Sequence, residues 1–269
     1  MSGCLILINK HPGTHPVGVG ETWWCLFAKC VLRFTWPEST NACQDEKLYD
    51  GLNTGIDGAI HGVQAIWDVN FSMEDWLFPL VDTKDMFKKI NQIRILWTVC
   101  HLWPPLACLV LNCYRHWSSL VLRNGNGMFS FLHIREGVTQ GDPLDMAADV
   151  IGVIPLIKWL KEAYPDVNQP WYVDDDGEIG MFNKIGLYFN LLKQFGLGRG
   201  YYPKPPKRIP IVHPDNIAVR KEFGLRHRFK VCTGTRYLGY FIGDDEFKHD
   251  WLKYWTLKWD NFFVQSPKQ

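Results

Sequence analysis

One run of seven residues constrains the fold of this chain more than any other. Residues 171–177 read Trp-Tyr-Val-Asp-Asp-Asp-Gly, so aromatic and β-branched residues lead directly into adjacent carboxylates and a glycine. This order is typical of a strand that ends in a tight turn with acidic groups at its tip. Neighbouring carboxylates repel one another, and a hard divalent cation with oxygen ligands is the usual compensation. A solvated acidic turn also explains the run on its own, so the rest of the sequence must decide.

The composition is that of a folded chain of 269 residues, with 46% hydrophobic residues and a formal net charge of +1. This length allows one large domain or two small ones. The small net charge argues against a histone-like nucleic-acid binder but is compatible with a local basic groove. The eight cysteines include no Cys-x-x-Cys pair, which is typical of reduced thiols in an intracellular protein.

Two apolar stretches are too short to direct the chain to a membrane. Residues 5–8 are too few for a signal peptide, and residues 102–113 contain two prolines and cannot cross a bilayer. We therefore expect an intracellular protein, in the nucleus or cytoplasm and not secreted, without a membrane partner.

A second acidic group follows another apolar run. Residues 76–82 end in Asp82, although Pro79 tells against a central strand or marks a bulge. A single aspartate at a strand end is more often a plain cap. If this strand neighbours the 171–177 hairpin, however, Asp82, Asp174 and Asp175 converge. They then form a site for one or two Mg²⁺ ions, which lie about 3.5–4 Å apart in two-metal enzymes.

Hydrophobic spacing and turn chemistry predict the other elements. The predicted helices cover residues 21–34, 59–67, 85–102, 106–117, 143–163, 182–195 and 247–263. The predicted strands cover residues 5–8, 208–213, 229–232 and 236–242, with a hairpin over 120–132, and residues 11–20 and 36–55 are predicted loops.

The segment 135–144 joins the 120–132 hairpin to the following helix. Its glycines allow the backbone to approach a ligand closely, and a helix N-terminus suits anionic groups. Asp142 is a suitable N-cap and Pro143 a suitable first helical residue. A well-capped junction without a ligand is the simpler interpretation of the same residues.

Taken in order, these motifs resemble those of reverse transcriptases, specifically of non-LTR retrotransposons. Residues 81–87 resemble motif A, and residues 136–144, Glu-Gly-Val-Thr-Gln-Gly-Asp-Pro-Leu, resemble motif B. Residues 172–175, Tyr-Val-Asp-Asp, resemble motif C. Lys207 stands where motif D has its lysine, and residues 236–240, Arg-Tyr-Leu-Gly-Tyr, resemble motif E. The resemblance covers nearly the whole chain, and the shared order makes it specific.

The resemblance implies an RNA-directed DNA polymerase with an α+β fold. The fold is the palm of a right-hand polymerase, an antiparallel sheet with helices packed on one face, plus partial fingers and a rudimentary thumb. The implied divisions are partial fingers over 1–75, a palm over 76–243 with a fingers-like insertion at about 103–135, and the start of a thumb over 244–269. The implied partners are an RNA template, a DNA primer and dNTPs.

The resemblance also assigns roles to individual residues. Two Mg²⁺ ions, or Mn²⁺, would bind to Asp82, Asp174 and Asp175. Phe87 would exclude a 2′-hydroxyl, Gln140 and Gly141 would line the nucleotide site, and Lys207 would neutralise pyrophosphate. The primer and template would contact Arg135, Tyr172, Tyr237, Leu238 and Gly239, and the basic residues between 204 and 236 would follow a phosphate backbone. Without the resemblance, Phe87 reads as a helix core residue, Lys207 as a solvated lysine, and Tyr237 and Leu238 as strand residues.

Four positions depart from the family pattern. His15 stands where an arginine is usual, Trp24 and Cys25 where basic residues are usual, and Met86 where a small residue is usual. The first three cannot supply charge for an incoming triphosphate. The alternative is therefore that the chain is a piece or degenerate copy of a retroelement. Such a remnant is catalytically dead and at most binds nucleic acid. A nucleotide cyclase is a third interpretation, against which the motif B loop and the motif E strand argue.

Overall fold

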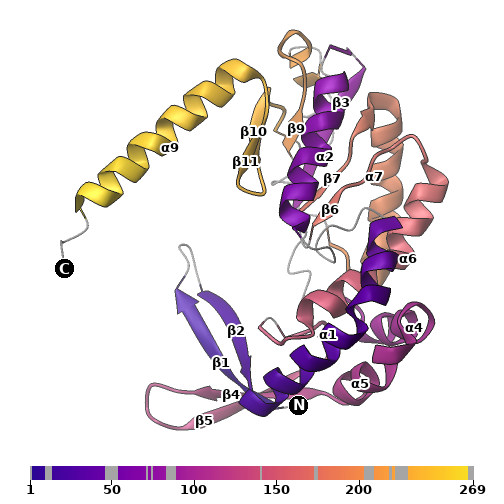
Figure 1. Ribbon diagram of the computed structural model, residues 1–269, viewed down its shortest axis with the longest axis vertical. Helices are drawn as coiled ribbons and strands as arrows, with labels where there is room; N and C mark the ends of the chain where they lie inside the picture. Colours follow the sequence, from indigo (N-terminus) through magenta and orange to yellow (C-terminus); the bar gives the residue numbers. More distant parts are fainter. Residues whose placement is uncertain are drawn as a thin grey trace.

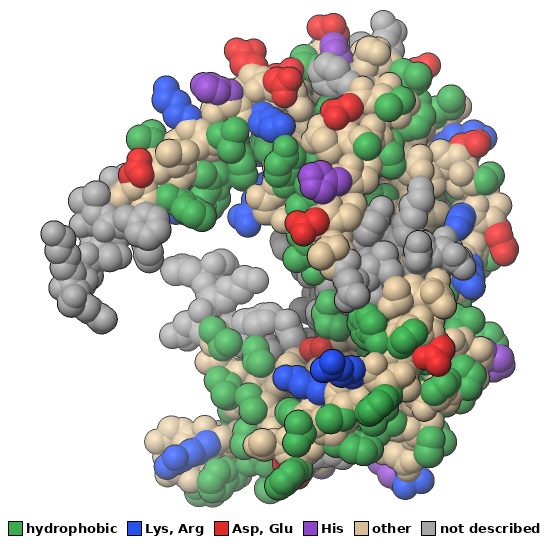
Figure 2. Space-filling view, viewed as in Figure 1, with side chains coloured by type: hydrophobic (Ala, Val, Ile, Leu, Met, Phe, Trp, Pro, Cys, Tyr) green, Lys and Arg blue, Asp and Glu red, His purple; other side chains and the backbone are tan. Residues whose placement is uncertain are grey.

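The computed structural model describes residues 2–9, 14–45, 54–70, 72–73, 75–82, 89–139, 141–172, 175–202, 209–217, 220–221 and 230–265. Within these residues the fold is mixed α and β (Figure 1). Helix α9 and the β1–β2 hairpin lie on opposite sides of an opening, and the space-filling view shows the surface hollowed between them (Figures 1 and 2).

A five-stranded sheet lies at the centre of the fold. It consists of β3 (Trp76–Asp82), β6 (Trp171–Tyr172), β7 (Asp175–Gly177), β8 (Gly180–Met181) and β9 (Ile209–Ile211). β3 pairs antiparallel with β7, β8 and β9 and is therefore the central strand.

The expectation that Pro79 tells against a central strand is wrong. Pro79 lies opposite Pro210, so neither residue of that pair has an N–H to donate. On the other side of β3, the Pro79 carbonyl accepts a hydrogen bond from the Glu178 N–H at 3.0 Å. Because the N–H and C=O of an antiparallel strand residue point to the same side, the missing N–H of Pro79 faces Glu178, which lies between β7 and β8. The sheet therefore loses one ladder hydrogen bond at a position where neither neighbouring strand is continuous.

Alternate residues of β3 are buried in two different clusters. Leu77 and Val81 pack with α6 (Asp145–Ala163) and α7 (Phe182–Gly196). Phe78 packs in another cluster with α2 (Gly55–Asn70). The expectation that helices cover only one face of the sheet is therefore corrected, because β3 is apolar on both faces and needs cover on each.

A second sheet has the strand order β2-β1-β4-β5. It consists of β1 (Ser2–Asn9), β2 (Thr14–Gly20), β4 (Ser118–Arg123) and β5 (Phe129–Ile134). The hairpin predicted around the Asn-Gly-Asn-Gly turn is present. The loop predicted over 11–20 is wrong from Thr14 onward, because pairing with β1 overrides the low strand propensity of glycine and proline at the sheet edge.

Three further helices surround the N-terminal half of α6. They are α1 (Thr22–Asp45), α4 (Gln92–Leu102) and α5 (Pro104–Tyr114), whose buried residues form a third cluster with those of α6. α1 continues through Pro37 to Asp45, so the loop predicted over 36–55 is wrong in its first part. Buried Trp103 donates its indole N–H to the Thr35 carbonyl at 2.8 Å, which helps to hold this helical extension in place.

The last elements are a hairpin and a projecting helix. The hairpin consists of β10 (Gly234–Tyr237) and β11 (Tyr240–Gly243), and α9 (Asp245–Gln265) follows it. The 3-10 turns η2 (Leu197–Arg199) and η4 (Pro214–Asn216) lie earlier in the chain. Within the predicted strand 229–232, the described residues 230–232 contribute a bridge between Cys232 and Ile211. The predicted strand over 236–242 is wrong, because this segment folds back on itself as the β10–β11 hairpin. None of the helices in the described ranges is both long and apolar enough to cross a membrane.

Candidate active site

The central sheet brings together the strands that carry two of the predicted catalytic residues. β3 and β7 pair in a register that places Asp82 opposite Asp175 and Val81 opposite Asp176. Cα atoms of residues directly opposite in an antiparallel pair lie about 4.5–5.5 Å apart. The backbone alone therefore places Asp82 and Asp175 side by side, although they are distant in sequence.

The predicted acidic hairpin is formed by β6 and β7. Tyr172 pairs with Asp175 and Trp171 with Asp176, so residues 173–174 connect the two strands. Five of the residues singled out in the sequence lie outside the described residues: Asp174, Phe87, Gln140, Lys207 and Met86. For Asp82 the backbone is described but the side chain is not. Among the side chains that the structure describes, no three His, Cys, Asp or Glu groups gather at metal-binding distances.

The third aspartate of the run has a different environment. Asp176 is only 1% exposed, and the hydroxyl of Tyr201 donates a hydrogen bond to its Oδ2. Glu178 is also fully buried, and burial raises the pKa of Tyr188, with a further contribution from the charges of Glu178 and Asp176. This buried layer was not predicted, although the two-residue period of a strand places Asp175 and Asp176 on opposite faces of the sheet and indicates different environments for them.

The motif B loop packs against the second sheet. Gly141 has φ +98°, and a Cβ added to it would lie 2.4 Å from the carbonyl oxygen of Gly18 in β2. Its N–H donates to Asp145 Oδ2 at 2.8 Å. Only glycine combines this conformation with such a close approach.

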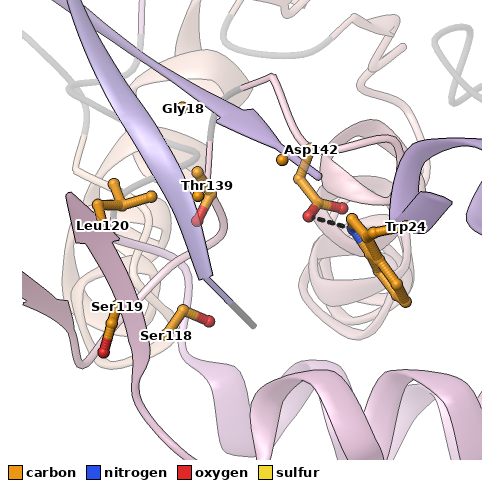
Figure 3. A pocket seen from close by; sticks show the side chains of 9 residues that line it. Gly18, Trp24, Ser118, Ser119, Leu120, Thr139 and Asp142 are labelled. Carbon is orange, nitrogen blue, oxygen red and sulfur yellow. Dashed lines mark hydrogen bonds between the residues drawn. The ribbon is translucent and has the colours of Figure 1, made fainter. Parts of the chain in front are cut away.

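Asp142 is not the N-cap of α6, contrary to the sequence prediction. The helix begins at Asp145, and the Asp142 Oδ1 instead accepts from the N–H of Leu144 at 2.8 Å, within the loop. Oδ2 accepts from the indole N–H of Trp24 at 2.9 Å (Figure 3). Burial raises the pKa of Asp142, although the bonds from Leu144 and Trp24 act in the opposite direction.

Trp24 therefore has a structural partner at a position where the family pattern has a basic residue. Trp24 and Asp142 line a cavity of about 20 Å³ together with Ser118, Ser119 and Thr139 (Figure 3). This volume has room for about one water molecule, so it does not accommodate a nucleotide. His15, another departure, pairs with Ile8 in the β1–β2 hairpin, and its side chain is not described.

The predicted primer-binding residues form the tight β10–β11 turn. Leu238 and Gly239 have φ +47° and +92°, the conformation of a hairpin turn with left-handed central residues. Tyr237 is only 2% exposed and packs edge-on against Phe78, with ring centroids 6.0 Å apart. Tyr237 therefore anchors the turn to the central sheet, while Gly239 is exposed.

A concavity of about 450 Å³ lies between this turn and α9. Trp251, Trp255 and Trp259 line it at intervals of four residues, so they follow one face of the helix. The guanidinium of Arg236 lies 5.6 Å from the Trp255 ring centroid, and Lys258 Nζ lies 4.6 Å from the same centroid. Figure 2 shows hydrophobic side chains along the side of α9 that borders the hollow. These tryptophans were not among the predicted site residues, although their four-residue spacing is present in the sequence.

Arg135, another predicted template contact, is exposed just after β5. Its guanidinium stacks over the Trp117 ring, 4.1 Å from the centroid. This contact orients the arginine and leaves its edge open to solvent.

Comparison with solved structures defines the class of fold: it is that of a reverse-transcriptase-like polymerase. The telomerase from Candida albicans, in complex with a TWJ fragment of telomeric RNA, superposes with a TM-score of 0.66 at 11% identity, over 90% of this chain and 45% of that one. Telomerase from Candida tropicalis in complex with a TWJ fragment gives 0.60 at 16% identity, over 78% of this chain and 41% of that one. The apo Candida tropicalis telomerase truncated from the C-terminal domain gives 0.60 at 14% identity, over 90% and 53%.

This chain thus spans about half the length of these telomerase chains. At such low sequence identities, the structural similarity establishes the fold and nothing beyond it. No protein-family model and no curated protein sequence matches the chain. The division into fingers, palm and thumb stays a prediction.

Proposed function

We propose that the chain is the polymerase domain of a reverse transcriptase of the non-LTR retrotransposon type. It joins a dNTP to the 3′-hydroxyl of a DNA primer on an RNA template, with release of pyrophosphate. The pairing of Asp82 with Asp175, next to the Tyr-Val-Asp-Asp hairpin, carries this proposal. The telomerase structures that contain a fragment of telomeric RNA support RNA binding by a fold of this kind.

The donor set fits two Mg²⁺ ions or Mn²⁺. Asp82, Asp174 and Asp175 offer carboxylate oxygens, the ligands that these hard cations prefer. Their closeness in the backbone would be unfavourable for ionised carboxylates without a cation. Bound metals would activate the primer hydroxyl and neutralise charge on the transferred phosphate.

The primer strand is proposed to lie in the concavity between the β10–β11 turn and α9. Stacking on an aromatic side chain contributes about 1–3 kcal/mol per base, and the three tryptophans there lie beside two cations. We keep the nucleotide-site roles that the family resemblance implies for Gly141, Gln140, Phe87 and Lys207. The implied contacts with primer and template are kept for Arg135 and Tyr172.

Primer extension on an RNA template with dNTPs and Mg²⁺ tests the proposal. Wild type is expected to extend the primer, and Asp175→Asn to abolish extension while the fold is kept. Asp57→Asn is the matched control, because Asp57 is exposed in the first turn of α2, outside the proposed site. Equal extension by wild type and Asp175→Asn would overturn the proposal.

The second candidate is a catalytically dead remnant that binds nucleic acid. The observation that favours it is the Trp24–Asp142 hydrogen bond, because a neutral indole occupies a position where triphosphate-binding charge is usual in the family. Template binding without extension would support this candidate. Extension regained by the combined changes His15→Arg, Trp24→Arg and Cys25→Lys would assign the loss to these positions.

A further inference from the structure

A concavity of about 530 Å³ lies on the outer flank of the molecule, apart from the site described above. It is formed by α4, α6 and η2. In Figure 1, α4 and α6 lie on the side of the molecule opposite to the opening between α9 and the β1–β2 hairpin. Neither the proposed polymerase chemistry nor the proposed primer path uses this surface.

Two arginines line this flank concavity. Arg94 on α4 donates from Nε to the Gly198 carbonyl at 3.3 Å, and Arg199 donates from a terminal nitrogen to the Phe195 carbonyl at 3.1 Å. These bonds use only part of the donor capacity of each guanidinium. The Nε–H of Arg199 is buried and has no acceptor among the described residues.

The two guanidinium charges lack a carboxylate partner in this surface. None of the described residues that line the concavity is acidic. Burial lowers the pKa of Arg199 from its ordinary value, and the positive charge of Arg94 lowers it further. Two neighbouring cations with open donors favour an anion between them, and planar guanidinium groups match phosphate oxygens in geometry.

Two further features of this surface suit an anionic ligand, a helix N-terminus and an unpaired hydroxyl. The concavity includes Asn91, the N-cap of α4, so it lies at the positive end of that helix dipole. Thr98, about two turns further along α4, is 0% exposed, and its hydroxyl has no hydrogen-bond partner in the described part of the chain. A buried hydroxyl without a partner is unusual, and here it borders the same concavity.

An aromatic ring stands next to the arginines. Trp97 lines the concavity, is 58% exposed, and stacks on His101 with ring centroids 4.2 Å apart. An exposed and braced indole offers a flat face to a nucleobase. The surface therefore combines groups that bind a phosphate with a group that stacks on a base.

We propose that this flank concavity binds the phosphate of a nucleotide, with Arg94 and Arg199 pairing with the phosphate oxygens and Trp97 stacking on the base. The phosphate is either the monoester of a free mononucleotide or a diester within a nucleic-acid strand. The site is independent of polymerase activity.

Equilibrium dialysis with three small probes tests the proposal: inorganic phosphate, adenosine 5′-monophosphate and the dinucleoside monophosphate ApA. We expect wild type to bind adenosine 5′-monophosphate more tightly than inorganic phosphate. Arg94→Gln and Arg199→Gln are each expected to weaken binding by about tenfold or more, because each removes charge-assisted hydrogen bonds. Arg115→Gln is the matched control, since Arg115 is exposed at the end of α5, outside the concavity.

A second comparison separates stacking from phosphate binding. Trp97→Leu is expected to remove the advantage of adenosine 5′-monophosphate over inorganic phosphate while leaving phosphate binding unchanged. ApA binding as tight as that of the monophosphate would assign the site to a strand, and monophosphate binding alone would assign it to a free nucleotide. Asp175→Asn is expected to bind like wild type, so loss of polymerase activity is distinguishable from loss of this site. Undetectable binding by wild type, or arginine variants that bind like wild type, would overturn the proposal.

Discussion

At the scale of single residues, the bond between Trp24 and Asp142 connects helix α1 to the loop that precedes α6. The indole N–H and the carboxylate are 118 residues apart in sequence, and Asp142 is only 4% exposed. A buried acceptor that loses its donor keeps the cost of desolvation without the compensating bond. The two side chains should therefore contribute to stability as a pair.

We expect Trp24→Phe to lower the free energy of unfolding by about 1–3 kcal/mol, because Asp142 then loses a donor while buried. Urea denaturation followed by circular dichroism measures this change. Trp23→Phe is the matched control: Trp23 is 80% exposed, so its replacement should change little. Equal effects of the two substitutions would show that the hydrogen bond contributes nothing to stability.

The raised pKa of Asp142 also predicts how stability depends on pH. In the unfolded chain an aspartate titrates near pH 3.9, below the pKa of Asp142 in the fold. Between these two values the folded state binds more protons, so this carboxyl destabilises the fold as the pH rises through that window. We expect the stability of wild type relative to Asp142→Asn to fall from about pH 4 upward and then to level off. A stability difference between wild type and Asp142→Asn that does not vary with pH would contradict the raised pKa of Asp142.

Among the residue-level expectations, the juxtaposition of Asp82 and Asp175 in the backbone is confirmed, whereas the expectations for Pro79 and for Asp142 as an N-cap are wrong. The Asp82–Asp175 juxtaposition follows from adjacent strands, each of which could be identified locally. The partner of Trp24 comes from another part of the chain, and no local pattern in the sequence indicates it.

At the scale of elements, the motif B loop is fixed by its contact with β2. Gly141 allows the loop to approach Gly18, with no room for a Cβ. We expect Gly141→Ala to destabilise the fold by about 1–3 kcal/mol, because alanine at this positive φ is strained and its Cβ meets the Gly18 carbonyl. Thermal unfolding measures the change. Gly125→Ala is the control, since an added Cβ there meets nothing within 4 Å; equal effects would show that this contact is not required.

The elements that were mispredicted from the sequence share a physical cause, because contacts with distant parts of the chain outweigh the local preferences of their residues. Glycine and proline in Thr14–Gly20 disfavour a strand locally, but seven residue pairs with β1 outweigh that preference. Polar residues after Phe34 predicted a loop, yet α1 continues to Asp45 while Trp103 packs against it. Strongly periodic segments such as α2 and α7 were predicted correctly, because their own apolar faces determine the helix.

At the scale of the whole molecule, the described chain has a reverse-transcriptase-like fold that carries a paired set of acidic positions. We propose that a divalent metal binds between the end of β3 and the β6–β7 hairpin. Two further surfaces on the same chain are proposed here, the α9 tryptophans for nucleic acid and the flank concavity for nucleotide phosphate.

Iron-mediated backbone cleavage detects a metal bound between the end of β3 and the β6–β7 hairpin. Fe²⁺ in place of Mg²⁺, with peroxide, an RNA template, a DNA primer and a dNTP, produces radicals that cut the chain next to the bound metal. If a metal binds there, we expect cuts both near Asp82 and near residues 172–175, and we expect excess Mg²⁺ to suppress them. The cuts should be lost in Asp175→Asn and retained in Asp57→Asn. Cuts at only one of these segments, or cuts that Asp175→Asn leaves unchanged, would contradict this metal site.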